Sequence, residues 1–273
     1  MSLPPAGRID AFAAIERTAL SIEGQLTPKE IRFLCLLAAF PTCAGEVLEI
    51  GSFKGRSTTV LAKAASLAGQ GAVVAVDPLT SPAATDPSLG GQSSGWADFQ
   101  ANLERAGVRA RVEFYRERSS ALAARWPAAR RIRLLWIDGD HTAAGAKADL
   151  AFFAPFLADG AIVALHDVLH NDGGPARVFA EDLLLSPGFG PAGLCGSIGW
   201  SQWFADPAGC VPYRRAKLRL YRRLQRFIPY VAFGGDIDGW AKLGYKLARA
   251  RIPHGEVSPA AWRAKVRFHP LAA

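Results

Sequence analysis

A short loop with two glycines follows the first strand predicted from the sequence. Residues 47–55 read Val-Leu-Glu-Ile-Gly-Ser-Phe-Lys-Gly and lead into a helix-like segment. Gly51 and Gly55 let the backbone turn tightly and approach a ligand, and the helix start offers free N–H donors. A dinucleotide fingerprint needs glycine where Phe53 stands, and the Gly-Lys-Ser/Thr ending of a phosphate loop is absent. The spacing suits a zwitterionic amino-acid group held by Glu49 and the backbone; the alternative is an ordinary strand–turn–helix.

An acidic residue ends the next apolar run. Residues 73–76 are Val-Val-Ala-Val, and Asp77-Pro78 follows them. A carboxylate at the end of the second strand of such a fold is well placed to accept hydrogen bonds from a ribose diol. Asp-Pro is also a common start of a turn. The distance of Asp77 from the glycine loop, one helix and one strand, favours the ligand-binding interpretation.

Carboxylates and imidazoles follow two further apolar runs. The runs are residues 132–137 and 161–165, and the polar residues after them are Asp138, Asp140, His141, His166 and Asp167. Because the ends of adjacent parallel strands meet at one crevice, we expect these five side chains to lie together. They could hold a divalent cation or supply a general base near neutral pH. The alternative is that they only cap helices and turns.

The elements that must position these residues alternate along the chain. Short β-branched runs are separated by helical stretches near residues 56–68, 96–106, 119–126 and 142–156. This alternation predicts an α/β fold: a Rossmann-like, doubly wound, mostly parallel sheet with helices on both faces. Thr27-Pro28-Lys29-Glu30 is a capping box that opens a helix through Phe40. The polar stretch 81–95 is interpreted as a surface loop or as a lid over the second strand's end.

From about Glu46 to Trp203 the sequence resembles class I S-adenosylmethionine-dependent methyltransferases, and especially the bacterial macrocin- and mycinamicin-type sugar and small-molecule O-methyltransferases. The resemblance rests on these motifs in order: Glu49-Ile50-Gly51 with Gly55-Arg56-Ser57, Val76-Asp77-Pro78, Phe99 with Asn102-Leu103, Ile137-Asp138-Gly139-Asp140-His141-Thr142, Lys147-Ala148-Asp149-Leu150, Leu157-Ala158-Asp159-Gly160 and His166-Asp167-Val168. It implies a seven-stranded sheet with a final antiparallel strand, for which Gly196–Phe204 is the candidate.

The resemblance also implies roles for individual residues. Glu49, Gly51, Ser52 and Gly55 would lie against the methionine part of S-adenosylmethionine, Asp77 would bind the ribose, and Arg118-Ser119 would lie by the adenine. The full set expected to bind the cofactor is Glu49, Gly51, Ser52, Gly55, Ser57, Asp77, Arg118, Ser119 and Asp138. Metal-dependent relatives carry Asp-Asp where this chain has His166-Asp167. Asp138, His166 and Asp167 are therefore the expected ligands of a metal ion, with Mg, Mn and Zn as candidates. For the general base we expect His141, with Asp140 as its rival.

Charge is distributed unevenly along the 273-residue chain. The net charge is +8, but residues 211–273 hold 14 Lys and Arg against 3 Asp and Glu, a net of +11, so the first 210 residues carry −3. Residues 213–228 predict an amphipathic helix with arginines opposite an apolar stripe, and a second helix is expected at 238–251. We expect an N-terminal helical segment (1–43), a methyltransferase domain (44–205) and a basic helical extension (206–273). The basic helix suits packing on the domain or a homo-oligomer partner, peripheral contact with an anionic membrane, or binding of a phosphorylated acceptor.

The sequence predicts an O-methyltransferase that is metal-assisted and modifies a hydroxyl of a sugar or other small polyol, such as a glycan or glycolipid intermediate. Four cysteines without metal or redox spacing, and no signal-peptide pattern, favour the cytoplasm, with contact at the inner membrane face. The alternatives are a nucleic-acid methyltransferase, suggested by a pI of about 9.6, and a non-catalytic cofactor-binding module. No nucleic-acid partner is expected, because the tail lacks the interleaved aromatics of a base-stacking platform.

Overall fold

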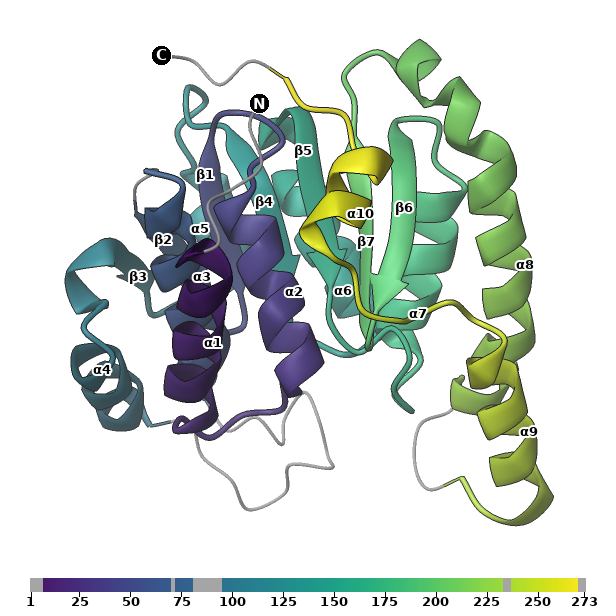
Figure 1. Ribbon diagram of the computed structural model, residues 1–273, viewed down its shortest axis with the longest axis horizontal. Helices are drawn as coiled ribbons and strands as arrows, with labels where there is room; N and C mark the ends of the chain where they lie inside the picture. Colours follow the sequence, from purple (N-terminus) through teal and green to yellow (C-terminus); the bar gives the residue numbers. More distant parts are fainter. Residues whose placement is uncertain (1–6, 70–71, 81–94, 233–236, 270–273) are drawn as a thin grey trace.

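A seven-stranded sheet forms the centre of the protein. The structure, a computed structural model, describes residues 7–69, 72–80, 95–232 and 237–269; the stretch considered as a lid lies largely outside them. The strand order is β3-β2-β1-β4-β5-β7-β6. The first five strands of this order are parallel, and β7 pairs antiparallel with both β5 and β6. The predicted fold class is confirmed, and the expected last strand corresponds to β7 (Figure 1).

The strands are β1 (Glu46–Ile50), β2 (Val73–Val76), β3 (Val112–Tyr115), β4 (Ile132–Ile137), β5 (Leu157–Leu165), β6 (Phe189–Cys195) and β7 (Ile198–Trp203). The helices are α1 (Gly7–Leu20), α2 (Pro28–Ala39), α3 (Arg56–Leu67), α4 (Trp96–Arg105), α5 (Ser119–Ala124), α6 (Ala143–Phe153), α7 (Gly174–Val178), α8 (Arg214–Val231), α9 (Gly239–Ala250) and α10 (Pro259–Lys265). Short helical turns occupy Arg109–Arg111, Ala154–Phe156, Phe179–Leu184 and Pro207–Tyr213.

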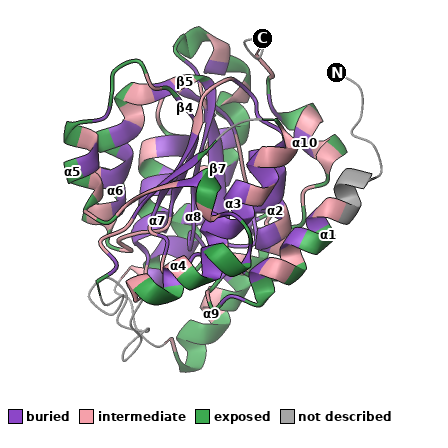
Figure 2. Cartoon of the chain, turned by 90° about the vertical axis from the view of Figure 1, so that its left-hand side faces the viewer, coloured by how far each residue is buried: buried purple, intermediate pink, exposed green. Residues whose placement is uncertain are grey.

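Two apolar cores lie on the two faces of the sheet. Val47 of β1 points into the core under α1–α4 and α10, whereas its neighbour Leu48 points into the core under α5–α9. This alternation follows from the two-residue period of a strand. Burying both faces explains why the central strands are almost continuously apolar. Figure 2 shows the buried residues concentrated in the sheet and on the helix sides that face it.

The predicted capping box begins α2. Thr27 accepts a hydrogen bond from the Glu30 N–H, and the Glu30 carboxylate accepts one from the Thr27 N–H at 2.9 Å. Pro28 stands in the first turn, where its missing N–H costs no helical bond. Glu30 is itself buried, so the residue that closes this cap also lies inside the molecule.

The C-terminal helices pack on opposite faces of the sheet. In α8, Leu224 and Phe227 are buried in one core, and the buried Lys217 ammonium donates to the carbonyls of Ser186 and Phe189. In α10, Trp262 is fully buried in the other core, with its ring centroid 4.8 Å from that of Trp200. No helix in the described ranges is long and apolar enough to cross a membrane.

Candidate active site

A cavity of about 510 Å³ opens where β1, β2, β4 and β5 end. Its volume is in the range of small-molecule sites, and its position is the one at which doubly wound folds bind ligands. It is lined by all the site residues expected from the sequence except Glu49 and Gly55, namely Gly51, Ser52, Ser57, Asp77, Arg118, Ser119, Asp138, Asp140, His141, His166 and Asp167. The topology thus brings together side chains that are up to 116 positions apart.

The glycine loop forms part of the cavity wall. Gly51 has φ +85°, and a Cβ there would lie 2.1 Å from the carbonyl oxygen of Asp138. Only glycine permits both this conformation and this close approach of β1 to β4. Gly55 also has positive φ and stands immediately before α3. Gly51 therefore keeps β1 close to β4 at the cavity, whose lining also includes Ser52 and Phe53 of this loop.

Asp77 fixes this loop in place. Its Oδ2 accepts hydrogen bonds from the N–H groups of Ser52 (2.7 Å) and Phe53 (3.0 Å), and its Oδ1 accepts one from Leu79 (2.7 Å). A carboxylate offers about four acceptor positions. The protein's own backbone uses three of those on Asp77, which leaves room for one further donor such as a ribose hydroxyl.

Glu49 lies behind the loop rather than in the cavity wall. It is fully buried, and its Oε2 accepts hydrogen bonds from the hydroxyls of Ser52 (3.0 Å) and Thr58. Its Oε1 has no hydrogen-bond partner in the described part of the chain. Burial raises the pKa of Glu49 to about 7, although nearby hydroxyls oppose the change. Glu49 is thus a buried acid whose pKa is close to neutral pH, and it lies directly behind the residues that line the cavity.

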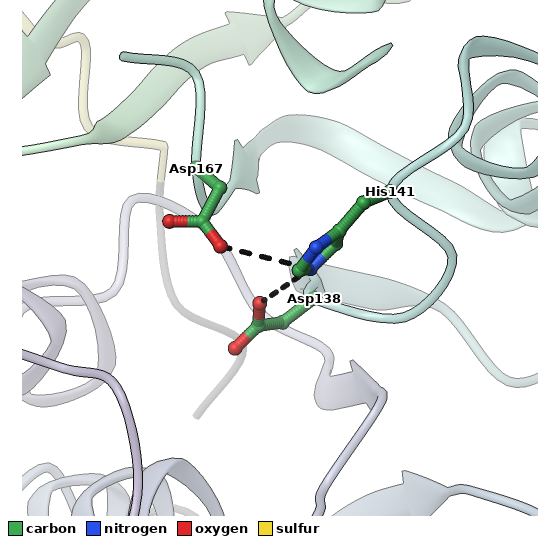
Figure 3. A group of neighbouring side chains, drawn as sticks. All are labelled: Asp138, His141 and Asp167. Carbon is green, nitrogen blue, oxygen red and sulfur yellow. Dashed lines mark ion pairs between the residues drawn. The ribbon is translucent and has the colours of Figure 1, made fainter. Parts of the chain in front are cut away.

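Asp138, His141 and Asp167 point toward one another (Figure 3), and all three line the cavity. The His141 Nε2 is 3.8 Å from Asp138 Oδ1 and 3.6 Å from Asp167 Oδ2. One donor atom of each residue lies within 4.8 Å of those of the other two, close enough to surround one metal ion. On the other side of the ring, Nδ1 is 3.6 Å from Asp172 Oδ2. Three carboxylates therefore surround an imidazole that reaches the cavity.

His166, which is buried, contacts the same two carboxylates. Its Nδ1 is 3.1 Å from Asp138 Oδ1 and 3.2 Å from Asp167 Oδ2. Its Nε2 faces Glu30 Oε2 at 3.9 Å. Burial alone would lower the pKa of His166, but Asp167 and Asp138 outweigh it and raise the pKa well above its ordinary value. His166 is thus a buried imidazolium among carboxylates, whereas the residue grouped with Asp138 and Asp167 around a possible cation is His141.

Asp140 has a local structural role. Its Oδ1 accepts the N–H of Thr142 at 2.8 Å, and Thr142 in turn caps α6 by accepting the N–H of Gly145. Asp140 therefore shapes the turn that carries His141. Arg118 and Ser119 lie at the start of α5, where the Ser119 hydroxyl donates to Asp149.

Three acidic residues of this region were not expected from the sequence as site residues. Glu30 accepts hydrogen bonds from the N–H and hydroxyl of Ser197 at 2.6 and 2.8 Å and faces His166, which helps to lower the pKa of Glu30 despite its burial. Asp172 contacts His141, and Asp149 lines the cavity with its pKa raised to about 6 by burial. In the sequence, the capping box fully accounts for an acidic residue at position 30, so no signal pointed to the contact of Glu30 with His166. Asp149 lay inside a motif of the resemblance, which could have marked it.

This sheet, with its cavity over the loop after β1, has the arrangement of a Rossmann-like methyltransferase fold. Residues 48–168 match a family model described as a methyltransferase domain. This match confirms, over that stretch, the resemblance noted in the sequence. No curated protein matches the chain.

Solved structures show the same fold. The O-methyltransferase TomG from Streptomyces achromogenes, involved in tomaymycin synthesis and solved with S-adenosylmethionine, is 18% identical; the match covers 72% of this chain and 90% of that one, with TM-score 0.51. A putative O-methyltransferase from Klebsiella pneumoniae is 15% identical, over 75% of this chain and 92% of that one, with TM-score 0.53. At these identities the likeness establishes the fold alone.

Proposed function

We propose that the domain transfers the methyl group of S-adenosylmethionine to a hydroxyl of a sugar or other small polyol. The observation that carries this proposal is the position of His141, an imidazole held among Asp138, Asp167 and Asp172 at the cavity. An acceptor hydroxyl must lose its proton to become a good nucleophile, and an imidazole with carboxylate partners is suited to take it. The two O-methyltransferase structures of the same fold support an oxygen acceptor.

The cavity suits each part of the cofactor. Gly51 and Ser52 line the part of the cavity that would receive the methionine end. Glu49 lies behind this loop, and its buried Oε1, which has no hydrogen-bond partner among the described residues, favours a positively charged group on the cavity side of the loop. The fourth acceptor position of Asp77 suits a ribose hydroxyl. Arg118 and Ser119 line the part of the cavity that would receive the adenine.

The reaction is then a displacement at the methyl carbon. A bond forms between the acceptor oxygen and the methyl group while the bond from that carbon to the sulfonium sulfur breaks, which leaves S-adenosylhomocysteine. The acceptor proton passes to His141 Nε2. The negative charges of Asp138 and Asp167 at 3.8 and 3.6 Å stabilise the imidazolium that results.

A metal-assisted form of the same reaction is the second candidate, because Asp138, His141 and Asp167 place one donor atom each around a common point. Two carboxylates and one imidazole fit Mn or Zn better than Mg, which prefers oxygen ligands alone. A cation bound there would lower the pKa of a coordinated acceptor hydroxyl. In this form His141 serves as a ligand and not as the base.

The metal-assisted form makes a separate prediction. If a cation takes part, prolonged dialysis against a chelator should abolish methyl transfer, and Mn²⁺ or Zn²⁺ should restore it. Elemental analysis of the protein before and after dialysis measures occupancy directly. Full activity in metal-free protein would remove the cation from the reaction and leave His141 as the base.

The acceptor class can be tested without knowing the acceptor. The protein is incubated with S-adenosylmethionine labelled in its methyl group and with a cell extract separated into lipid, glycan, small-molecule and RNA fractions. We expect label in a hydroxyl-bearing lipid, glycan or small molecule, in a form that resists mild alkali, because a methyl ether is stable there and a methyl ester is not. Label confined to RNA, or released by alkali, would contradict the proposal.

Asp77 provides a test of the cofactor site. We expect Asp77→Ala to weaken S-adenosylmethionine binding by more than tenfold, or about 1.4 kcal/mol, because a ribose acceptor is lost and the loop loses its anchor. Asp77→Asn keeps one carbonyl acceptor and should lose less. Calorimetry on both variants, with circular dichroism to show that they are folded, measures the difference. Unchanged affinity in folded Asp77→Ala would place the ribose elsewhere.

A further inference from the structure

Helix α9 carries an apolar stripe that faces away from the protein. Trp240, Leu243 and Leu247 are 88%, 47% and 50% exposed. Their spacing of three and four positions puts them on one side of the helix, within an arc of about 60°. Large apolar side chains gathered in this way cost free energy in water, and such patches mark interaction sites. The stripe is therefore a candidate surface for an apolar partner.

The stripe is held rigidly in this orientation. On the opposite side of α9 the Tyr245 hydroxyl donates to the carbonyl of Leu169 at 3.1 Å, and its ring lies 5.4 Å from that of Phe227 in α8. Ala248 is buried, and a Cβ on Gly244 would lie 2.6 Å from the Tyr230 ring. The inner side of α9 is thus already packed against the protein, and the stripe cannot turn inward without breaking these contacts.

Basic side chains border the stripe on both sides. Lys246 lies about 60° around α9 from Leu243, Lys242 lies about 40° further along the same flank, and both are exposed. On the other edge Arg223, Arg226 and Arg251 line a surface cavity that also includes Leu247 of the stripe. No carboxylate among the described residues pairs with any of these five cations. A partner must therefore be apolar at its centre and negatively charged around it.

We propose that this α9 surface, formed by Trp240, Leu243 and Leu247 with the five bordering cations, docks on an anionic phospholipid membrane. Trp and Leu insert at the boundary between headgroups and acyl chains, and guanidinium and ammonium groups bind lipid phosphates. Tyr245 ties the surface to Leu169, two residues beyond Asp167, so the docked side adjoins a loop of the active site. The inference concerns the membrane alone and does not depend on the proposed methyl transfer.

A second copy of the chain is a poorer occupant. In a symmetric dimer the same patch meets itself, so the two sets of five cations would face one another without counter-charges. A nucleic acid would satisfy the cations but would leave the leucines against a hydrated backbone. Of these three occupants, the lipid surface alone provides hydrocarbon and phosphate together. The arginines of α8 expected from the sequence to contact a membrane, including Arg219 and Arg222, are also exposed.

Sedimentation with vesicles tests the proposal on the full chain. At low salt we expect binding to vesicles of phosphatidylcholine with about one-third phosphatidylglycerol, weak binding to phosphatidylcholine alone, and a decline as salt rises. Trp240→Ser with Leu243→Ser should reduce binding at least tenfold, and Lys242→Gln with Lys246→Gln should reduce it at least fivefold. These side chains are exposed, so the variants should fold normally.

Two controls match these variants elsewhere on the surface. Val211→Ser removes an exposed apolar side chain outside the α9 surface, and Arg111→Gln with Lys265→Gln removes two exposed charges away from it; both should bind as the wild type does. Binding that survives the serine variant, or that needs no anionic lipid, would overturn the proposal. So would light scattering that shows the wild type as a dimer, the serine variant as a monomer, and no vesicle binding by either.

Discussion

Replacing His141 by alanine should lower kcat by about 10²- to 10⁴-fold, the contribution usual for a positioned general base. The affinity for S-adenosylmethionine should change by no more than about twofold, because a base acts only once the acceptor attacks. The geometry supports this separation: His141 approaches Asp138, Asp167 and Asp172, whereas Ser52 and Asp77 belong to the glycine loop and its anchor.

Two further measurements distinguish a base from a structural residue. The fall of kcat at low pH, where the imidazole is protonated, should disappear in His141→Ala, and added imidazole should restore part of the rate. His269→Ala is the matched control, because His269 pairs with Asp159 at the other end of the sheet; it should keep wild-type turnover. If cofactor affinity in His141→Ala falls in step with kcat and imidazole does not help, His141 only maintains the site.

The fold was predictable because its pattern is local. Strands β1, β2, β4 and β5 contain short apolar runs with β-branched residues, and each is followed by a polar residue or glycine, so these runs and their ends could be located without knowing any contact. The topology of parallel strands then placed Asp77, Asp138 and Asp167 at one edge. Eleven residues expected at the site line one cavity for this reason.

What the sequence could not provide were contacts between distant elements. Glu30 is a normal capping residue by every local criterion, and only the packing of α2 on the sheet brings it to His166 and Ser197. Asp172 reaches His141 through a loop without a motif. Trp262 belongs to the basic tail by sequence, yet it completes the core around Phe33 and Trp200. Hydrophobic pattern and spacing do not encode such pairings.

The position of Glu49 illustrates the same limit. Strand period and the glycine loop located it at the end of β1, but the alternation that directs Ile50 and Leu48 to one face directs Glu49 to the other, behind the loop. There it receives hydroxyl donors from Ser52 and Thr58 and no cation within hydrogen-bonding distance among the described residues. A carboxyl in that environment resists ionisation, which has a measurable consequence for stability.

The free energy of unfolding of the ligand-free protein should contain a contribution from Glu49 that falls as pH rises from about 4.5 to above 7. The pKa of Glu49 is about 7 in the folded protein, against an ordinary value of 4.5. Between these values the folded state keeps a proton that the unfolded chain has lost, so raising the pH favours unfolding. The full change is about 3 kcal/mol, from about 1.4 kcal/mol per pKa unit. Glu49→Gln, which resembles the protonated acid, should lack it.

Urea unfolding of the wild type and Glu49→Gln at several pH values between 4.5 and 8.5 measures this contribution. Other titrating groups, including Asp149 with its pKa of about 6, are common to both proteins and cancel in the difference. We expect the glutamine variant to gain stability relative to the wild type steadily across this range and to reach a plateau above pH 8. A difference independent of pH would mean that Glu49 is already ionised in the folded protein, stabilised by the hydroxyls of Ser52, Ser57 and Thr58.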